Sequence, residues 1–424
     1  MNVRKESAAA WQTPVPDAHP AAKLLTANAV RARCAAIMAA AERGETRHLA
    51  WQPDRIKAAA AYVADTIRQR YPSLDVPYHS RWRHFEVGGV DRWAQIAAAL
   101  PDNRAERART RIDLAITSVL LDAGAGAAWR YVDAATGTTL ARSEGLAVAG
   151  LRLFAAGAFS ARTDAPYATD ASALARLDMH TLAQGFQVAA DNPLVGLEGR
   201  AALLRRLGVV ATATPAVFGA PARLGHLYDY LIAHARDGTV SAEFLLETLL
   251  RALGPVWPRR LVLEGVALGD CWRHPAARAA TPDDPTDGYV PFHKLTQWLA
   301  YSLLEPLEEA GLAVTGLDEL TGLPEYRNGG LMLDLGVLVP LDAGFLRRRH
   351  AVDDEAIVEW RALTVIALDR IATAVRTELG VTREAFPLPR VLEGGTWAAG
   401  RRIAAERRDG GASPVSIDSD GTVF

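Results

Sequence analysis

The sequence contains very little cysteine. Among its 424 residues only Cys34 and Cys271 occur, and they do not form a CxxC pair. Two isolated thiols argue against a disulfide framework and against a thiolate zinc site, and they fit a reducing compartment. We therefore expect a cytoplasmic protein.

Long apolar runs and an excess of charge are also absent. No uncharged apolar run reaches the roughly 18 residues that a membrane span needs, and the chain does not open with a signal-peptide pattern. The 47 Lys and Arg residues nearly balance the 49 Asp and Glu residues, for a formal net charge of −2. This balance provides no electrostatic footprint for duplex nucleic acid. We expect partners that are neither membranes nor nucleic acids.

Several common catalytic motifs are missing. The sequence has no GxxxxGK[ST] phosphate loop, no GxSxG nucleophile elbow and no HExxH helix. Gly124 and Gly126 follow a helix-like run and lack a third glycine, so they make a poor dinucleotide fingerprint. The ten histidines do not cluster with Cys or Asp at ligand spacing. We expect neither a metal nor a cofactor.

The residues that are present favour a mainly α-helical protein. Half are hydrophobic and 23% are charged, which provides a sizeable core and excludes global disorder. Helical periodicity recurs, strands are few and short, and no fixed-period repeat is found, so one large helical unit over residues 22–424 is expected after a loosely held arm at residues 1–21. A hairpin is predicted at residues 130–139 and a loop at residues 281–288. Helices are predicted at residues 24–41, 54–71, 103–123, 146–156, 172–184, 197–207, 221–235, 241–253 and 353–379.

The stretch 288–334 holds two candidate functional pieces. On the helix predicted after Pro291, the side chains of Lys294, Gln297 and Tyr301 share one face and could meet a phosphate or a sugar. A solvated helix face is the ordinary explanation of such a pattern.

The second piece is a predicted loop at residues 321–330, where Pro and Gly flank Glu325, Tyr326 and Arg327. A surface ion pair with a packed ring would explain it equally. Asp318, just before this loop, is a candidate ligand or a helix N-cap.

Two further clusters carry charges beside aromatic rings. Cations and rings alternate in one seven-residue segment that suits an anion flanked by a stacking surface: His79, Arg81, Trp82, Arg83, His84 and Phe85. A loop with packed rings and solvated cations is the alternative. Glu393 precedes two glycines and Trp397, which leaves room for a ligand or another backbone. A tight turn before the last helix is the alternative.

Together these side chains could cleave a glycosidic bond. Departure of the leaving group makes an oxocarbenium-like sugar, which one carboxylate stabilises while a second acid assists. Glu325 and Glu393 are the candidates for these two acids. Whether the groups converge is decided by the fold.

The same segments carry a family resemblance. HSRWRHF, PFHKLTQWL, LTGLPEYRNGG, LEGGTWAAGR and the terminal SDGTVF resemble the uracil catabolism protein family of fungi and bacteria, from about residue 22 to residue 424. The resemblance implies a role in degrading uracil by way of its nucleotide, with ribosylurea-type intermediates and release of urea.

A more distant resemblance concerns the mechanism. Queuosine salvage proteins are nucleotide N-glycosidases on a helical DNA-glycosylase-like scaffold, and their FYKRAQ helix and DYRxPQ loop are similar to the segments around Lys294 and Glu325 here. The similarity implies that Glu325 takes the place of the catalytic aspartate and that Lys294 contacts the phosphate or ribose. Glu393 resembles a late acid that precedes a tryptophan. Glu replaces Asp, and Asn328 with Gly329 replaces Pro-Gln, so a smaller, ureido-like leaving group is implied.

The leading hypothesis is that the protein is an N-glycosidase that acts on a phosphorylated riboside. Its catalytic acids would be Glu325 and Glu393. The phosphate of the riboside would meet Lys294 and two arginines, the walls of the site would be aromatic, and other polar side chains would assist. These substrate-binding candidates are Lys294, Gln297, Arg81, Trp82, Arg83, His84, Phe85, Tyr326, Arg327, Asp318 and Trp397.

Two rival hypotheses remain. One is a non-catalytic nucleotide-binding partner of the pathway's ring-opening enzyme. Under this hypothesis and under the N-glycosidase hypothesis, association with other uracil-catabolism enzymes is expected. The other is a nucleic-acid glycosylase, against which the balanced charge argues.

Overall fold

The computed structural model describes residues 14–122, 124–279, 281 and 283–418. Most of the predicted arm, residues 1–13, and the terminal SDGTVF motif, residues 419–424, lie outside the described residues. The remainder of the arm leads into a short 3₁₀ helix, η2 (Pro20–Leu24), in which Ala21 is buried.

The protein is mainly α-helical, as predicted. Within the described ranges, none of the helices combines the length and the apolar character that a bilayer-spanning segment requires. The α-helices are α1 (Ala27–Glu42), α2 (Ile56–Arg70), α3 (Trp82–Phe85), α4 (Trp93–Ala99), α5 (Arg104–Leu120), α6 (Arg142–Ala155), α7 (Ala171–Ala175), α8 (Met179–Gly185), α9 (Leu197–Thr212), α10 (Pro215–Phe218), α11 (Leu227–His234), α12 (Ala242–Leu253), α13 (Lys294–Glu309), α14 (Tyr326–Asp334), α15 (Glu355–Leu379), α16 (Leu388–Arg390) and α17 (Trp397–Arg407).

The strands form short two-stranded ladders rather than a layer. Several ladders join segments far apart in the sequence, so they act as ties between helices. The β2–β3 ladder confirms the predicted hairpin. The pairs are β1 (Leu49–Trp51) with β10 (Leu338–Pro340), β2 (Tyr131–Asp133) with β3 (Thr138–Leu140), β4 (Thr239–Ser241) with β9 (Ala313–Thr315), β5 (Val262–Leu263) with β6 (Val266–Ala267), β7 (Cys271–Arg273) with β8 (Tyr289–Pro291), and β11 (Arg349–Ala351) with β12 (Ser416–Asp418).

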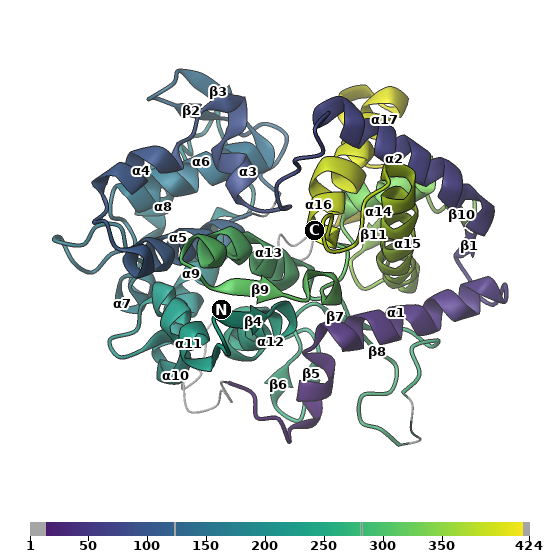
Figure 1. Cartoon of the computed structure of the whole chain (residues 1–424), viewed down its shortest axis with the longest axis horizontal. Coiled ribbons are helices and arrows are strands. Elements are labelled where there is room, and N and C mark those ends of the chain that lie inside the picture. Colours follow the sequence, from purple (N-terminus) through teal and green to yellow (C-terminus); the bar gives the residue numbers. More distant parts are fainter. Residues whose placement is uncertain (1–13, 123, 280, 282, 419–424) are drawn as a thin grey trace.

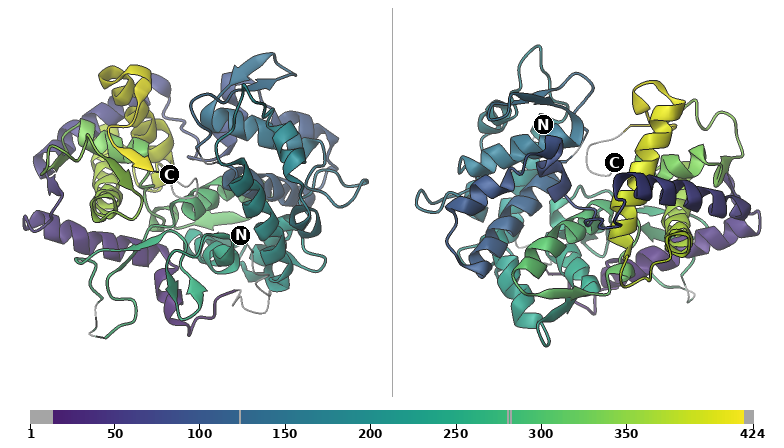
Figure 2. Two further views of the ribbon diagram at one scale, coloured as in Figure 1. Left: turned by 180° about the vertical axis from the view of Figure 1, so that it is seen from behind. Right: turned by 45° about the horizontal axis from the view of Figure 1, so that its top comes forward.

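The helices gather in two groups. One group contains α3 to α6, α8 and α9 from the first half of the chain, and the other contains α2, α14, α15 and α17 (Figure 1). The views in Figure 2 show the same division. Helix α15 packs against α1, α2 and α14, whereas α13 packs against α5 of the first group and against α12. Helix α13 lies near the centre of the view in Figure 1, on the side of the first group that faces the second.

The structure differs from the sequence-based expectations in three segments. The helix predicted at 172–184 is divided into α7 and α8, because Asp178 between them is extended. The helix predicted at 221–235 begins only at α11. The loop predicted at 321–330 turns helical at Tyr326, so the prediction was wrong for its second half. Gly329 lies inside α14, where a Cβ atom would come within 2.5 Å of Trp360. That glycine permits close packing of α14 on α15 and does not shape a loop.

Candidate active site

A cavity of about 360 Å³ lies where the two helix groups meet. Its wall comes from the α3 region, the segment after α5, the start of α6, α13, the segment before α14, and α17. Five predicted site residues line it together: His84, Lys294, Glu325, Tyr326 and Trp397. The other lining residues are His79, Asp122, Gly124, Ala125, Gly126, Ala127, Arg142, Ser143, Trp298 and Leu323.

Glu325 is the N-cap of α14. Its Oε2 accepts a hydrogen bond from the Arg327 N–H and its Oε1 accepts one from the Asn328 N–H, each at 2.7 Å. Ser, Thr, Asp and Asn are the usual N-caps, so a glutamate here is uncommon. Burial raises the pKa of Glu325 above its ordinary value, although the two backbone hydrogen bonds and the charge of Lys294 oppose the shift. A carboxylate with a raised pKa accepts a proton more readily, which suits acid–base chemistry.

The segment before Glu325 is held by side chains of α13. Gln297 donates from Nε2 to Thr321 Oγ1 at 2.7 Å and to the Phe292 carbonyl at 3.0 Å. Its Oε1 accepts the Thr321 N–H at 2.9 Å, and the Tyr301 hydroxyl donates to the Thr321 carbonyl at 2.9 Å. Both side chains are fully buried. The amide and the phenol therefore hold the segment that presents Glu325, and they do not line the cavity.

Lys294 begins α13 and is fixed through its backbone. Its N–H donates to Asp270 Oδ2 at 3.0 Å, and Arg361 clamps the same carboxylate at 2.7 and 2.8 Å. Asp270, from a distant segment, thus caps the helix. In the part of the chain that the structure describes, the ammonium of Lys294 has no hydrogen bond or ion pair. Burial lowers the pKa of Lys294, and the carboxylates of Glu325 and Asp122 partly offset this shift. The ammonium lies near two acids and is open to a ligand.

His79 and Glu393 form a buried pair at the same wall. His79 Nδ1 lies 2.7 Å from Glu393 Oε2, and both side chains are about 6% exposed. Burial would raise the pKa of Glu393, but the hydrogen bond and the charge of His79 outweigh burial and lower it. His79 lines the cavity and Glu393 does not. Since Nδ1 is engaged, Nε2 is the ring nitrogen of His79 left for a ligand. Glu393 therefore orients the imidazole from behind.

The glycines after Glu393 serve packing. The segment is a π-helical turn, η8 (Val391–Thr396), so the alternative of a tight turn was wrong. A Cβ at Gly394 would come within 2.8 Å of Val76, and one at Gly395 within 2.8 Å of Val63. Neighbouring side chains occupy the room that the glycines leave. Such π turns are frequent at functional sites.

Indole and imidazole rings build one side of the cavity. The ring centroids of His79 and Trp397 are 5.6 Å apart, and those of His84 and Trp298 are 5.7 Å apart in an edge-to-face arrangement. Burial and the charge of Arg81 lower the pKa of His84 to about 4, so this imidazole is neutral at neutral pH. His84 Nδ1 and Trp298 Nε1 are buried without a hydrogen-bond partner among the described residues. Both residues line the cavity.

The predicted arginines do not line the cavity. Arg81 is fully buried, donates from Nε to Ser118 Oγ at 2.8 Å, and pairs with Asp122 at 3.0 Å. Arg83 donates to Glu305 at 2.7 Å on another face.

Other predicted residues form structural contacts away from the cavity. Trp82 donates from Nε1 to the Ser302 carbonyl at 2.8 Å, and Phe85 packs on its ring at 5.3 Å. Arg327 donates to the Gly411 carbonyl at 2.7 Å. Asp318 pairs with Arg376 at 2.6 Å and lines a different pocket. Apart from the ring contact within α3, each of these interactions joins segments distant in the sequence.

Sequence reasoning missed several lining residues. Trp298 belongs to the apolar stripe of α13, so its pattern indicates core. Gly124 and Gly126 were noted as a weak fingerprint, and their backbone forms part of the wall. Asp122 and Arg142 carry no local motif. Within the described ranges, no group of three or more His, Cys, Asp and Glu side chains is arranged to hold a metal ion.

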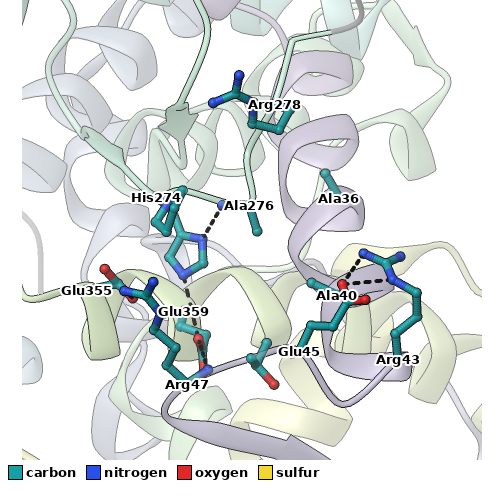
Figure 3. A pocket seen from close by; sticks show the side chains of 12 residues that line it. Ala36, Ala40, Arg43, Glu45, Arg47, His274, Ala276, Arg278, Glu355 and Glu359 are labelled. Carbon is teal, nitrogen blue, oxygen red and sulfur yellow. Dashed lines mark hydrogen bonds and ion pairs between the residues drawn. The ribbon is translucent and has the colours of Figure 1, made fainter.

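A second pocket, of about 310 Å³, lies between α1, the segment after β7 and α15 (Figure 3). Most of its charged groups are paired with one another, and Arg278 pairs with Asp287 outside the pocket. His274 Nε2 lies 3.6 Å from Glu359 Oε2, while the Ala276 N–H reaches His274 Nδ1 at 3.2 Å. Arg43 and Glu45 pair at the rim at 2.6 Å. The His274–Glu359 contact ties the segment after β7 to α15, and the pocket offers less free polar chemistry than the cavity at Glu325.

Comparisons with known proteins identify the family. The model of a family described as a protein of unknown function (DUF1688) matches residues 23–424. Protein urg3 from Schizosaccharomyces pombe is 38% identical over 412 residues, which cover 95% of this chain and 98% of the relative. Uracil catabolism protein 4 from Lachancea kluyveri is 38% identical over 411 residues, which cover 90% of this chain and 93% of the relative. These relatives confirm the resemblance seen in the sequence motifs, and the chain belongs to the DUF1688 family.

Proposed function

We propose that the protein acts in uracil catabolism as an N-glycosidase. It would hydrolyse the bond between ribose 5-phosphate and the ureido group of a ring-opened pyrimidine nucleotide, which gives ribose 5-phosphate and urea or a ureido product. Kinship with a relative named uracil catabolism protein 4 supports the pathway. The residues of the cavity support the chemical step.

The observation that carries the proposal is the meeting of Glu325, Lys294 and His79 at one cavity of about 360 Å³. Hydrolysis of a glycosidic bond needs a group to activate water, a proton for the leaving nitrogen and negative charge near the sugar. A buried carboxylate and an oriented imidazole on one wall provide the first two. Indole rings beside them suit a flat ureido group.

In this proposal Glu325 is the general base. As the C1–N bond breaks and the sugar gains positive charge, Glu325 accepts a proton from the attacking water, whose oxygen bonds to C1. His79, protonated and held by Glu393, donates its Nε2 proton to the leaving nitrogen. Solvent then carries the proton from Glu325 back to His79. The products are ribose 5-phosphate and the protonated, neutral ureido compound, so atoms and charges balance.

The direct test uses the purified protein with ribosylurea 5-phosphate and, separately, UMP. We expect urea and ribose 5-phosphate to appear in equal amounts from the first compound. If neither compound is cleaved, the proposal fails. A rise in melting temperature with ligand but no product would instead support the non-catalytic nucleotide-binding partner.

A matched pair of variants tests the role of Glu325. Glu325→Gln should lower kcat/KM by about 10²- to 10⁴-fold, the usual range for loss of a general base. Glu319→Gln, an exposed neighbour, should leave kcat/KM unchanged. Because the pKa of Glu325 is raised, the acidic limb of kcat/KM should lie above the ordinary value of about 4.3, and the variant should lack that limb. Full activity in Glu325→Gln would refute this role alone.

A further inference from the structure

A second carboxylate, that of Asp122, also lines the cavity, just beyond the end of α5. Its Oδ1 lies 3.0 Å from Arg81 Nη1 and is shielded from solvent. The side chain also forms a hydrogen bond with Ser143, another lining residue, and it retains 12% exposure. The carboxylate is therefore held in place and still meets the cavity.

The anchor itself is rigid. Arg81 is fully buried, donates from Nε to Ser118 Oγ at 2.8 Å, and receives further support because its backbone N–H donates to Ser302 Oγ at 3.0 Å. Arg81 also lies over the Trp298 ring, with its guanidinium carbon 5.6 Å from the ring centroid. A carboxylate held by such a group keeps its position when charge develops in a ligand, as electrostatic preorganisation requires.

The two cavity carboxylates have opposite electrostatic surroundings. Burial would raise the pKa of Asp122, but the charge of Arg81, assisted by Lys294, outweighs burial and lowers it. For Glu325 burial prevails and the pKa is raised. Both Glu325 oxygens accept backbone N–H groups, whereas Asp122 is held by the guanidinium of Arg81 and by the side chain of Ser143. When the surroundings of two acids move their pKa values apart in this way, the acids usually take different roles: one transfers a proton and the other stays ionised.

We propose that Asp122 is the carboxylate that remains ionised throughout and stabilises the positive charge on the sugar, while Glu325 handles the proton of the attacking water. The inference rests on the proposed N-glycosidase function. It adds a catalytic residue, and it implies that the site prefers a pentose ring carrying positive charge near C1.

A binding measurement tests this preference without turnover. The probes are 1,4-dideoxy-1,4-iminoribitol 5-phosphate, whose ring nitrogen is protonated at neutral pH, and ribose 5-phosphate, whose ring is neutral. The wild-type protein should bind the cation at least about 10²-fold more tightly, as expected for a mimic of the transition state. Asp122→Asn should lower that ratio by about 10- to 10²-fold and leave the affinity for ribose 5-phosphate unchanged.

The matched control is Asp133→Asn. Asp133 is equally a buried carboxylate, 1% exposed, with Arg92 at 2.8 Å and Arg152 at 3.0 Å, but it does not line the cavity. Its variant should lose stability and keep the preference for the cation. If Asp122→Asn does not fold, the double variant Arg81→Gln with Asp122→Asn replaces it, because it leaves no unpaired buried charge.

A kinetic measurement separates the roles of the acids. With 4-nitrophenyl ribofuranoside 5-phosphate the leaving group needs no proton, so His79→Gln should recover most of its activity whereas Asp122→Asn should remain impaired. If the wild-type protein cleaves ribosylurea 5-phosphate and the Asp122→Asn variant keeps the wild-type preference for the cation, this inference is overturned and the proposed function stands. A wild-type protein that does not cleave ribosylurea 5-phosphate would overturn both.

Discussion

Replacement of Gln297 by methionine tests whether this amide supports the cavity or binds the substrate. Methionine has nearly the same volume and helix propensity, so the substitution removes hydrogen bonds and leaves packing almost unchanged. The Gln297 amide makes three hydrogen bonds, two with Thr321 and one with the Phe292 carbonyl, at 2.7 to 3.0 Å. A buried polar group left without its partner costs about 1 to 3 kcal/mol. With three partners left unpaired, we expect a loss of about 3 to 9 kcal/mol in the free energy of unfolding.

This loss converts into a measurable shift in melting temperature. Unfolding entropy is about 2.1 cal/mol/K per residue, which for 424 residues is about 0.9 kcal/mol/K, so Tm should fall by about 3 to 10 °C. Activity should fall through kcat, because Glu325 is displaced, with KM nearly constant. The control is Gln184→Met in α8, an exposed position at which Tm should not move. Scanning calorimetry and steady-state kinetics on both variants give the answer. A Tm within 1 °C of the wild-type value, together with a raised KM, would show that Gln297 contacts the substrate and would refute the reasoning.

Three further outcomes are expected. Gly400→Ala places a Cβ 2.4 Å from the Arg327 carbonyl oxygen where α14 meets α17, so it should lose about 1 to 3 kcal/mol in urea denaturation. Gly199→Ala in α9 meets nothing within 4 Å and should gain about 0.5 kcal/mol; equal shifts in the two variants would contradict the packing argument. Because the pKa of Glu393 is lowered in the folded state, its contribution is complete above the unfolded value of about 4.3 and is lost as pH falls through the folded pKa. Glu393→Gln should therefore be less stable than the wild type by about 1 to 3 kcal/mol at pH 7, and the difference should shrink below about pH 4.

Most of the helices could be predicted from local sequence alone. The helix predicted at 353–379 is found at Glu355–Leu379, because apolar residues recur at helical spacing and Gly380 ends it in a left-handed conformation. The division at Asp178 and the helical start at Tyr326 were not predicted. Both depend on how neighbouring segments pack, which residue patterns within one segment do not specify.

The candidate site was predictable in part, for a similar reason. Lys294 and Glu325 belong to recognisable motifs, and the fold brings them to one cavity. The residue types of Arg81 and Gln297, a cation and an amide, suggested contacts with a ligand. Their side chains instead form hydrogen bonds with Ser118 and Thr321 from other segments. Asp122 follows an ordinary helix end, and only the distant Arg81 gives it a special environment.

The residues of the cavity wall are spread over a long stretch of the chain, from His79 to Trp397. During synthesis the imidazole leaves the ribosome long before Glu393, the group that orients it. A nascent or truncated chain that lacks η8 and α17 also lacks Glu393, which orients His79, and Trp397, which lines the cavity. The proposed activity should therefore arise only after η8 and α17 have been synthesised, and a proteolytic cut that releases these two elements should abolish it even when the remaining helices stay folded.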